Sequence, residues 1–412
     1  MLRRAVSRWS IVIVPFLCLM AACQRGESVP TAAGPTSDWA AAPLAQPTAS
    51  PSSTWPEPPT GATPTAVPGL GEWSRGASAP AARLVVYCDF QSIGCAALTP
   101  VLSTLLSLHP QELLVTYRPY PLIPVHDKAS LAGQAAQAAG EQGRFWEMHD
   151  LLYGRWLEWA SLSPEDFQAW LLEAAEEIGL EGPSFRQALE SGRHAELMQQ
   201  AFDQAVADGI PGTPVLYLNG QLFQIGPSLE NLEAATRLAI LGSRQYQEYP
   251  PLLIEPDVVY VAHLELGTGE VVVELFADVA PLAVNSFVFL ARQGWYDGAP
   301  FFRVVPDVLA ETGDPSGTGL GGPGYAFGTE TDPSLSFDQP GMVALSSAGP
   351  GVCGSQFFIS LGAIPGLNGS RTIFGQVTQG LGLLQGLGPR DPLPDLLVPA
   401  EAQILGLRIE ER

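Results

Sequence analysis

The chain has 412 residues, of which 46% are hydrophobic and 15% charged, and this composition predicts two or three folded domains with buried cores. Its formal net charge is −22, from 20 lysine and arginine residues against 42 aspartate and glutamate residues. Nucleic-acid binding needs a positive surface that displaces counterions from phosphates, so nucleic acid is excluded as an expected partner.

The first 22 residues have the layout of a secretory signal. Arg3, Arg4 and Arg8 precede an apolar run of about a dozen residues, which is too short for a membrane span, and small residues follow. The stretch LMAAC resembles the lipobox of bacterial lipoproteins, with Cys23 as the lipidated residue. We expect an extracytoplasmic chain, lipid-anchored to a bacterial membrane; the alternative is an ordinary cleaved signal with an incidental cysteine.

Residues 23–81 are predicted to be a disordered tether that begins at the lipidated cysteine. They are rich in Pro, Ala, Thr, Ser and Gly and show no helical or strand periodicity. Such a composition buries too little apolar surface to offset the entropy of ordering. Trp39, Trp55 and Trp73 lie in this segment, and the composition gives no account of them.

Residues 82–243 are predicted to form the first folded domain. The stretch RLVVYCDF is typical of a buried strand in a parallel sheet, and a helix over about 95–108 and a strand in ELLVTYRPY follow it. A helical block comes next. Within it, Ser163 fits an N-cap and Pro164 the first helical position.

A hairpin and a helix close this domain. The strands Val215–Leu218 and 221–225 flank Asn219-Gly220, a pair suited to a type I′ turn, and PSLENLEAATRLAIL predicts the last helix. The order β-α-β, helical insertion, β-β-α is that of an α/β thioredoxin-like fold.

Three stretches carry a more specific resemblance. YCDFQSIGCAALTP, RPYPLIPVHDKASLAGQAAQAAGEQGRFWEMHDLLY and GIPGTPVLYLNG together resemble the DsbA-like thioredoxin family. The resemblance implies a cis proline at Pro214 that faces a C-x-x-C site. Cys95 matches the second cysteine of that site, but Ser92 stands in place of the attacking cysteine, and a hydroxyl cannot form a disulfide.

This degenerate motif predicts a redox-inactive domain that keeps a peptide-binding role through strand addition beside the proline. Three alternatives stay open for Cys88 and Cys95: two small buried apolar residues, a structural bridge between them, or live thiol chemistry.

Residues 244–256 are expected to be a linker, and residues 257–412 a second domain. VVYVAHLELGTGEVVVELF predicts a hairpin, and APLAVNSFVFLARQG predicts a helix. Short β-rich runs separated by Gly and Pro follow. Many short strands with two helices favour a closed β-barrel with two capping helices.

The stretches VVELFADVAPLAVNSFVFLARQGWYDGAPFFRVVPDVLAETGDPSGTGLGGPGY, FDQPGMVAL, GSQFFISL and FGQVTQGLGLL resemble cyclophilin-type peptidyl-prolyl isomerases. The run GDPSGTGLGGPGY is the most specific of these matches. The resemblance covers nearly the whole second domain and implies a proline-peptide site on it.

Rotation about an X-Pro bond is slow because amide resonance gives a barrier of about 18–20 kcal/mol. A cationic donor near the amide nitrogen favours the twisted state, in which the nitrogen lone pair is localised. Arginine suits this task because it is always charged and presents a fixed fork of donors. The catalytic arginine of the family maps onto Arg303.

The resemblance also assigns the grip on substrate backbone to Gln356 and the proline pocket to Phe358. The other pocket positions fall on Val308, Leu309, Glu311, Ser347, Leu367 and Arg371. The chain departs from the family pattern at Phe302, Val308, Glu311, Ser347, Gly366 and Arg371, which predicts a weakened peptide grip and a slow isomerase. Glu311 is expected near Arg303, and Cys353 is expected to be an exposed free thiol.

These features predict an extracytoplasmic folding factor that isomerises X-Pro bonds, with unfolded or proline-containing secreted polypeptides and a membrane as its partners. The alternatives are a non-catalytic chaperone or scaffold, and a thiol-disulfide oxidoreductase that uses Cys88 and Cys95. The five histidines lack the spacing of metal ligands, so neither a metal nor a cofactor is expected.

Overall fold

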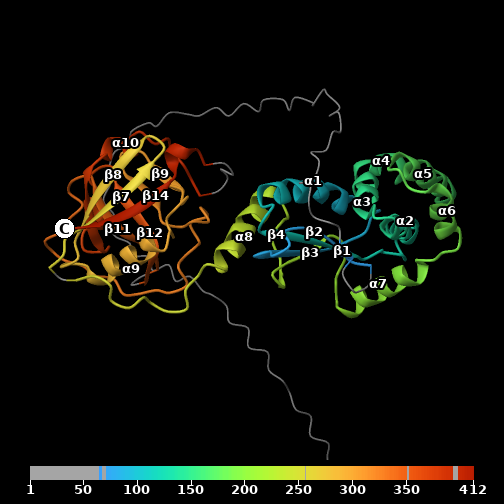
Figure 1. The fold of residues 1–412 in the computed structure, drawn as a ribbon, viewed down its shortest axis with the longest axis horizontal. Coiled ribbons are helices and arrows are strands. Elements are labelled where there is room, and N and C mark those ends of the chain that lie inside the picture. The colour runs from blue at the N-terminus through green and yellow to red at the C-terminus, as the bar shows by residue number, and fades with distance from the viewer. Residues whose placement is uncertain (1–64, 67–70, 256, 350–351, 393–397) are drawn as a thin grey trace, which may run out of the picture. The chain divides into compact units, whose positions relative to one another are not determined.

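The computed structural model describes residues 65–66, 71–255, 257–349, 352–392 and 398–412 (Figure 1). The predicted signal segment, Cys23 and the tether up to residue 64 lie outside the described residues. Two sheets divide the described part into an N-terminal and a C-terminal domain. In these ranges no helix has both the length and the apolar character that crossing a membrane requires.

The N-terminal domain is built on a six-stranded sheet with the order β1-β2-β4-β3-β5-β6. Its strands are β1 (Thr65–Ala66), β2 (Trp73–Gly76), β3 (Ala82–Cys88), β4 (Leu113–Pro119), β5 (Val215–Leu218) and β6 (Gln221–Leu222). β3 and β4 are parallel because the helix α1 (Ile93–Leu108) connects them, whereas β5 pairs antiparallel with both β3 and β6.

The remaining helices confirm the predicted helical insertion, which lies between β4 and the β5–β6 hairpin. They are α2 (Ala129–Glu141), α3 (Phe145–Gly154), α4 (Trp156–Trp159), α5 (Pro164–Glu177), α6 (Gly182–Glu190) and α7 (Ala195–Ala207), with α8 (Leu229–Gly242) after the hairpin. Ser163 caps α5, as predicted, by accepting a hydrogen bond from the backbone N–H of Asp166. Asn219 and Gly220 both have positive φ, as the predicted turn requires.

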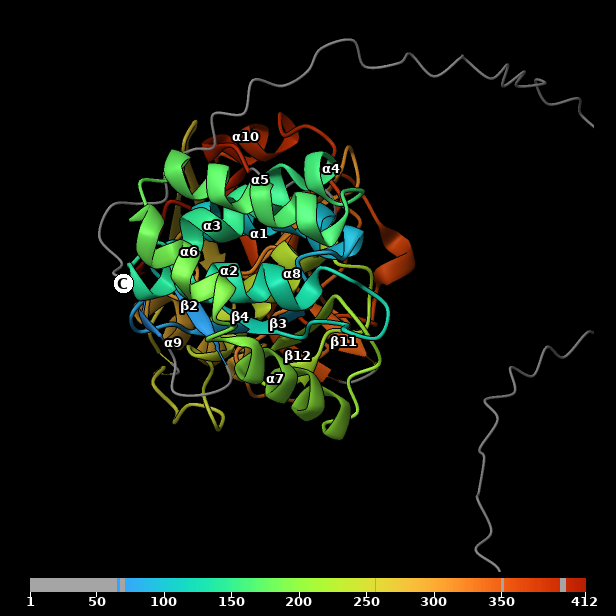
Figure 2. The same cartoon turned by 90° about the vertical axis from the view of Figure 1, so that its right-hand side faces the viewer.

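The two faces of this sheet carry different cores because side chains alternate along a strand. Leu84 and Val86 of β3 belong to the larger core, to which α1 contributes, whereas Tyr87 packs with Ala205 of α7 and with Ile210. Figures 1 and 2 show α1 and α7 on opposite sides of β2, β3 and β4.

The expected tether ends earlier than residue 81. Trp73 in β2 stacks on Phe145 with the ring centroids 4.7 Å apart, and its Nε1 donates to Gln137. One partly buried indole and the β2–β4 ladder provide the ordering energy that the composition of the segment does not predict.

The C-terminal domain holds an eight-stranded sheet with the order β14-β7-β8-β13-β11-β12-β10-β9. Its strands are β7 (Tyr260–Leu266), β8 (Gly269–Leu275), β9 (Arg303–Val305), β10 (Leu309–Thr312), β11 (Met342–Gly349), β12 (Val352–Ser360), β13 (Ile373–Gln379) and β14 (Gly406–Glu411). The helices are α9 (Pro281–Arg292), α10 (Leu381–Gln385) and the 3₁₀ turns η1 (Pro365–Leu367) and η2 (Ala400–Ala402).

The predicted closed barrel is wrong, because the sheet curls into a half-barrel that stays open between β9 and β14. β9 has only three residues, and its outer side is bridged to Arg390 through a pair of backbone hydrogen bonds with Val304. The segments that precede the two edge strands meet at the bridge between Pro300 and Gln403, which is flanked by backbone hydrogen bonds from Phe301 to Ala402 and from Ile404 to Ala299.

Residues 244–255, predicted as a linker and called the connector below, pack on the C-terminal domain. Asn285 of α9 is fully buried. Its Oδ1 accepts from the backbone N–H of Leu253 at 2.6 Å, and its Nδ2 donates to the carbonyl of Pro251 at 3.0 Å. Tyr249 of the connector donates its hydroxyl to the carbonyl of Leu282 at 2.7 Å. Tyrosine side chains and backbone groups of the connector bind it to α9. The Pro and Gln content of the segment does not predict these contacts.

Replacing Asn285 tests whether the connector is part of the domain. Asn285→Ala leaves the backbone N–H of Leu253 and the carbonyl of Pro251 without their side-chain partner. The expected loss is about 1–3 kcal/mol in the free energy of unfolding of the C-terminal domain. Calorimetric unfolding of the full chain measures it, with Gln247→Ala as a control because Gln247 is exposed. An unchanged C-terminal transition contradicts the prediction.

Candidate functional site

Five strands of the C-terminal sheet align the predicted site residues in one row. Arg303 of β9 lies opposite Glu311 of β10, and Glu311 lies opposite Phe358 of β12. The row continues through Ala344 of β11 to Ile373 of β13. Residues paired directly across antiparallel strands project from the same face, so Arg303, Glu311 and Phe358 share one face of the sheet.

The opposite face forms the core of the domain. Val304, Ala310, Phe357 and Ile359 alternate with the residues of the row and belong to the main hydrophobic cluster. The face of the row carries a separate group, called the outer apolar cluster, which consists of Phe337, Met342, Ala344, Phe358 and Ile373. The sheet thus separates the main core from a second, smaller apolar cluster on the face of the row.

Phe358 lies at the centre of the outer apolar cluster. Its ring stacks on Phe337 with the centroids 5.6 Å apart. Leu309 and Leu367 pack against the cluster but are only partly buried, so the cluster reaches solvent on that side. Phe358 itself is only 4% exposed, so the two leucines are the apolar groups of this site that solvent reaches.

Arg303 places a cation beside this apolar surface. Its side chain is 47% exposed, and its Nη1 lies 3.4 Å from Oε2 of Glu311, whose side chain is 13% exposed. The expected proximity of Glu311 to Arg303 is therefore observed. The contact is long for a charge-assisted hydrogen bond, and the remaining donors of the guanidinium are open to a ligand.

Gln356 lies two residues before Phe358 on the same face of β12. Its Nε2 donates to the carbonyls of Gly321 at 2.7 Å and of Gly319 at 3.1 Å. Both glycines belong to residues 313–324, called the glycine-rich loop below. With Nε2 engaged in this way, the amide oxygen is the group that Gln356 presents to a ligand.

Asp314 organises the glycine-rich loop and was missed by the sequence analysis. It is fully buried and accepts hydrogen bonds from the hydroxyls of Ser316 and Thr318 and from the backbone N–H of Gly321. An aspartate followed by serine, glycine and threonine is a signal for such a turn, so the sequence did contain the information.

The other predicted pocket residues lie around the row. Val308 is 36% exposed in the turn between β9 and β10. The backbone of Ser347 lies in β11 opposite Cys353. Arg371 is half-buried two residues before β13 and makes no hydrogen bond or ion pair with any described residue. In the described ranges no group of three His, Cys, Asp or Glu residues is placed to hold a metal ion.

Cys353 corrects a further expectation, because it is a free thiol but is buried rather than exposed. It lies in β12 on the core side, in line with Phe357. The Gly-rich context suggested a loop, but the residue belongs to a central strand whose alternation turns the thiol inward.

The degenerate thiol motif lies at the start of α1 in the N-terminal domain. Of the three alternatives for its cysteines, the structure has the bridge: Cys88 and Cys95 form a disulfide with a Cα–Cα distance of 5.9 Å. Both residues are buried, at 4% and 1% exposure, whereas exchange requires a thiolate to reach a sulfur atom. The bridge therefore fits a structural role better than a redox role.

Ser92 takes a structural role at the helix start, where its Oγ accepts from the backbone N–H of Cys95 at 3.4 Å. The predicted cis peptide bond at Thr213-Pro214 is present. Pro214 packs closely on Gly94, since a Cβ at Gly94 would lie 2.8 Å from Cδ of the proline. The cis proline and the start of α1 are thus in close contact, with a hydroxyl rather than a thiol at position 92.

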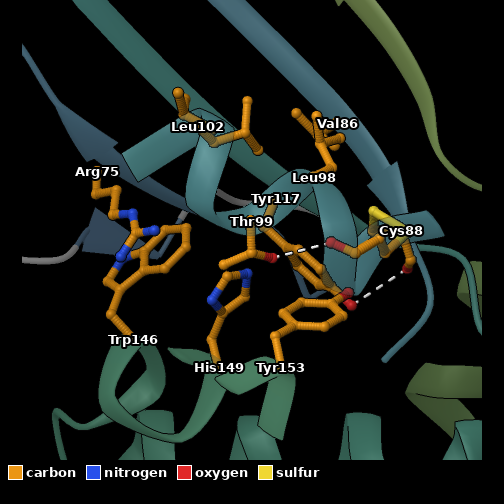
Figure 3. A pocket seen from close by; sticks show the side chains of 12 residues that line it. Arg75, Val86, Cys88, Leu98, Thr99, Leu102, Tyr117, Trp146, His149 and Tyr153 are labelled. Atoms are coloured by element: carbon orange, nitrogen blue, oxygen red, sulfur yellow. Dashed lines mark hydrogen bonds between the residues drawn. A yellow bond between two sulfur atoms is a disulfide. The ribbon is translucent and has the colours of Figure 1, made fainter. Parts of the chain in front are cut away.

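Beneath the disulfide lies a cavity of about 20 Å³, lined by both cysteines and by Arg75, Tyr117, Trp146, His149 and Tyr153 among others (Figure 3). Thr99 and Tyr117 donate their hydroxyls to the carbonyls of Cys95 and Cys88. Burial lowers the pKa of His149 below its usual range. The volume suits about one water molecule, so no substrate fits there.

Asp89 and His126 hold the loop around the thiol motif. Asp89 is buried; its carboxylate accepts from the backbone N–H groups of Gln91 and Leu122 and lies 2.8 Å from Nδ1 of His126. The hydrogen bond to Asp89 raises the pKa of His126. The side chain of Gln91 accepts from the backbone N–H of Lys128, so the loops on both sides are tied together.

Exposed apolar side chains surround this motif. Ile93 is 67% exposed at the start of α1, Val125 is 76% exposed three residues before Lys128, and Leu157 is 84% exposed in α4. Trp156 connects α4 to the motif by donating to the carbonyl of Gln91 at 3.1 Å. The three residues lie at the start of α1, in the loop before α2 and in α4, and a contiguous apolar patch built from them would suit an interaction surface.

Comparisons with known proteins agree with both resemblances. Residues 261–391 match the family described as cyclophilin type peptidyl-prolyl cis-trans isomerase/CLD, and residues 83–237 match the DSBA-like thioredoxin domain. Peptidyl-prolyl cis-trans isomerase-like 1 of Mus musculus is 42% identical over 142 residues, which are 34% of this chain and 84% of that protein. Probable peptidyl-prolyl cis-trans isomerase A of Mycobacterium bovis is 44% identical over 137 residues, covering 30% of this chain and 75% of the relative.

Among solved structures, a cyclophilin type peptidyl-prolyl cis-trans isomerase of Cryptosporidium parvum is 30% identical. The match covers 37% of this chain and 98% of that one, with a TM-score of 0.34.

Proposed function

Because this chain belongs to the cyclophilin-type peptidyl-prolyl cis-trans isomerase family, we propose that its outer apolar cluster and Arg303 isomerise X-Pro bonds in extracytoplasmic polypeptides. The observation that carries the proposal is the row of paired residues. It puts Arg303 of β9 and Phe358 of β12 on one face of the sheet, with only β10 between their strands. Neither residue alone distinguishes an isomerase from an ordinary sheet surface.

The proposed mechanism needs no covalent step. The proline ring rests on Phe358 between Leu309 and Leu367, while the amide oxygen of Gln356 accepts a backbone N–H of the substrate. The guanidinium of Arg303 then donates to the imide nitrogen as the bond twists and the lone pair becomes localised. This interaction is stronger in the twisted state than in either planar state, which is the condition for acceleration.

We expect a slow enzyme. Glu311 is a carboxylate that shares the guanidinium of Arg303, so the positive charge available to the substrate is reduced. Val308, Gly366 and the serine at 347 provide less apolar area or fewer hydrogen-bonding groups than the family pattern implies. If these substitutions abolish the acceleration altogether, the site only binds proline-containing peptides, which is the non-catalytic alternative.

Arg303→Ala should lower kcat/KM for a proline-containing peptide by about a hundredfold, because the donor to the twisted imide is lost. Isomerase kinetics with the full chain measure the loss. Arg408→Ala is the matched control, since Arg408 lies on β14 at the far edge of the same sheet and should leave the rate unchanged. Equal rates for wild type and Arg303→Ala would favour the binding-only function.

Glu311→Gln should raise kcat/KM several-fold, because it removes the carboxylate that competes for Arg303 while preserving the size of the side chain. The same kinetics test this variant. A fall in rate would instead show that the carboxylate holds the guanidinium in its working position.

We propose that the thioredoxin-like domain holds clients while the isomerase domain acts. Support comes from the exposed Ile93, Val125 and Leu157, and from the cis proline at 214, beside which the backbone of an extended peptide can pair. A domain with a buried disulfide and a serine at the attacking position retains a binding surface without exchange chemistry.

Ile93→Ser combined with Leu157→Ser should weaken binding of a permanently unfolded, alkylated polypeptide by about tenfold, since two exposed apolar contacts are removed. Fluorescence anisotropy of the labelled polypeptide measures the affinity. Leu108→Ser is the control, because Leu108 is exposed at the other end of α1. Equal affinities for the wild type, the double variant and Leu108→Ser would remove the support for this surface.

An extracytoplasmic location is part of the proposal. The layout of the first 22 residues and the lipobox-like LMAAC support it. The Cys88–Cys95 disulfide agrees with it, because such bonds persist mainly in oxidising compartments.

A further inference from the structure

We propose that the connector positions the isomerase site, with Gln245 and the backbone of Tyr246 holding the glycine-rich loop that orients Gln356. The proposal rests on the isomerase function proposed above. It assigns a role in the reaction to residues that precede the first strand of the domain.

The connector and the glycine-rich loop are joined by two hydrogen bonds. Nε2 of Gln245 donates to the carbonyl of Gly322 at 2.9 Å, and the backbone N–H of Tyr246 donates to the carbonyl of Pro323 at 2.8 Å. Gly324 has φ +91°, and a Cβ there would lie 2.2 Å from the carbonyl oxygen of Tyr246. The two backbones therefore touch, and glycine alone fits at the contact.

The connector is itself fixed to the body of the domain. The ring of Tyr246 packs edge-on against Phe289 of α9, with centroids 4.9 Å apart, and lies 6.3 Å from Trp295. Trp295 is buried and donates its Nε1 to the carbonyl of Gly313, where the glycine-rich loop begins. The connector thus gives the loop an anchor on α9 as well as on the sheet.

The loop in turn fixes Gln356. The carbonyl of Gly321, which accepts from Gln356 at 2.7 Å, is one residue before the carbonyl of Gly322, which accepts from Gln245. Pro323 also packs on β12, since a Cβ at Gly354 would lie 3.3 Å from its Cδ. The peptide units gripped by the connector and by the substrate-binding glutamine are therefore adjacent.

The loop needs such an anchor because of its composition. Six of its twelve residues are glycine, which loses more conformational freedom on ordering than any other residue. A mobile loop would let the amide of Gln356 rotate and would raise the entropic cost of binding a peptide. The connector lowers that cost by restricting the loop before substrate arrives.

A double-mutant cycle with the full chain tests the proposal. Gln245→Ala should raise KM for a proline-containing peptide about two- to fivefold with little change in kcat, because the grip on the substrate is loosened. Gln245→Glu should match it, since a carboxylate cannot donate to the Gly322 carbonyl. In a Gln356→Ala background, Gln245→Ala should have no further effect, because both changes act through the same amide.

Gln247→Ala is the matched control, because Gln247 is an exposed glutamine of the connector with no hydrogen bond to any described residue, and it should behave as wild type. Gly324→Ala separates connector and loop more strongly and should raise KM further. Losses that multiply in the double mutant, or a wild-type KM for both Gln245→Ala and Gly324→Ala, would overturn the positioning role. An inactive wild-type chain would instead overturn the proposed function, and the positioning role with it.

Discussion

The antiparallel register of β9, β10 and β12 is the constraint on which the site depends. It places the basic Arg303, the acidic Glu311 and the aromatic Phe358 side by side on one face of the sheet. The residues adjacent to them in sequence turn into the core. A shift of one residue in β10 would turn Glu311 inward and Ala310 outward, so the burial of Phe357 and Ile359 also fixes the site. Stability and chemistry are therefore specified by the same pairing.

Sequence patterns predicted what local physics determines. The cap at Ser163, the Asn219-Gly220 turn and the β-rich runs followed from propensity and alternation, and the resemblances placed Arg303, Glu311 and Phe358. The open sheet and the ordered connector escaped prediction because they depend on contacts between distant segments, such as Arg390 with Val304 and Tyr246 with Pro323. Trp73 was visible in the sequence, but its partner Phe145 lies 72 residues away.

The N-terminal domain has an ordered framework around its degenerate thiol motif. A serine at the helix start still caps the helix, the cis proline still packs on Gly94, and a disulfide to the preceding strand replaces the exchangeable pair. The buried carboxylate of Asp89 ties the surrounding loops together. The exposed apolar residues are thus carried on a rigid support, which suits binding better than electron transfer.

The open sheet has a consequence for the solubility of the chain. An unpaired strand edge invites any extended polypeptide to join it, and a half-barrel has two such edges. Here one edge is bridged by the segment at Arg390, and the other, β14, carries Arg408, Glu410 and Glu411 along its six residues. Charge along β14 discourages uncontrolled strand capture, so the sheet can remain open without promoting aggregation of the chain.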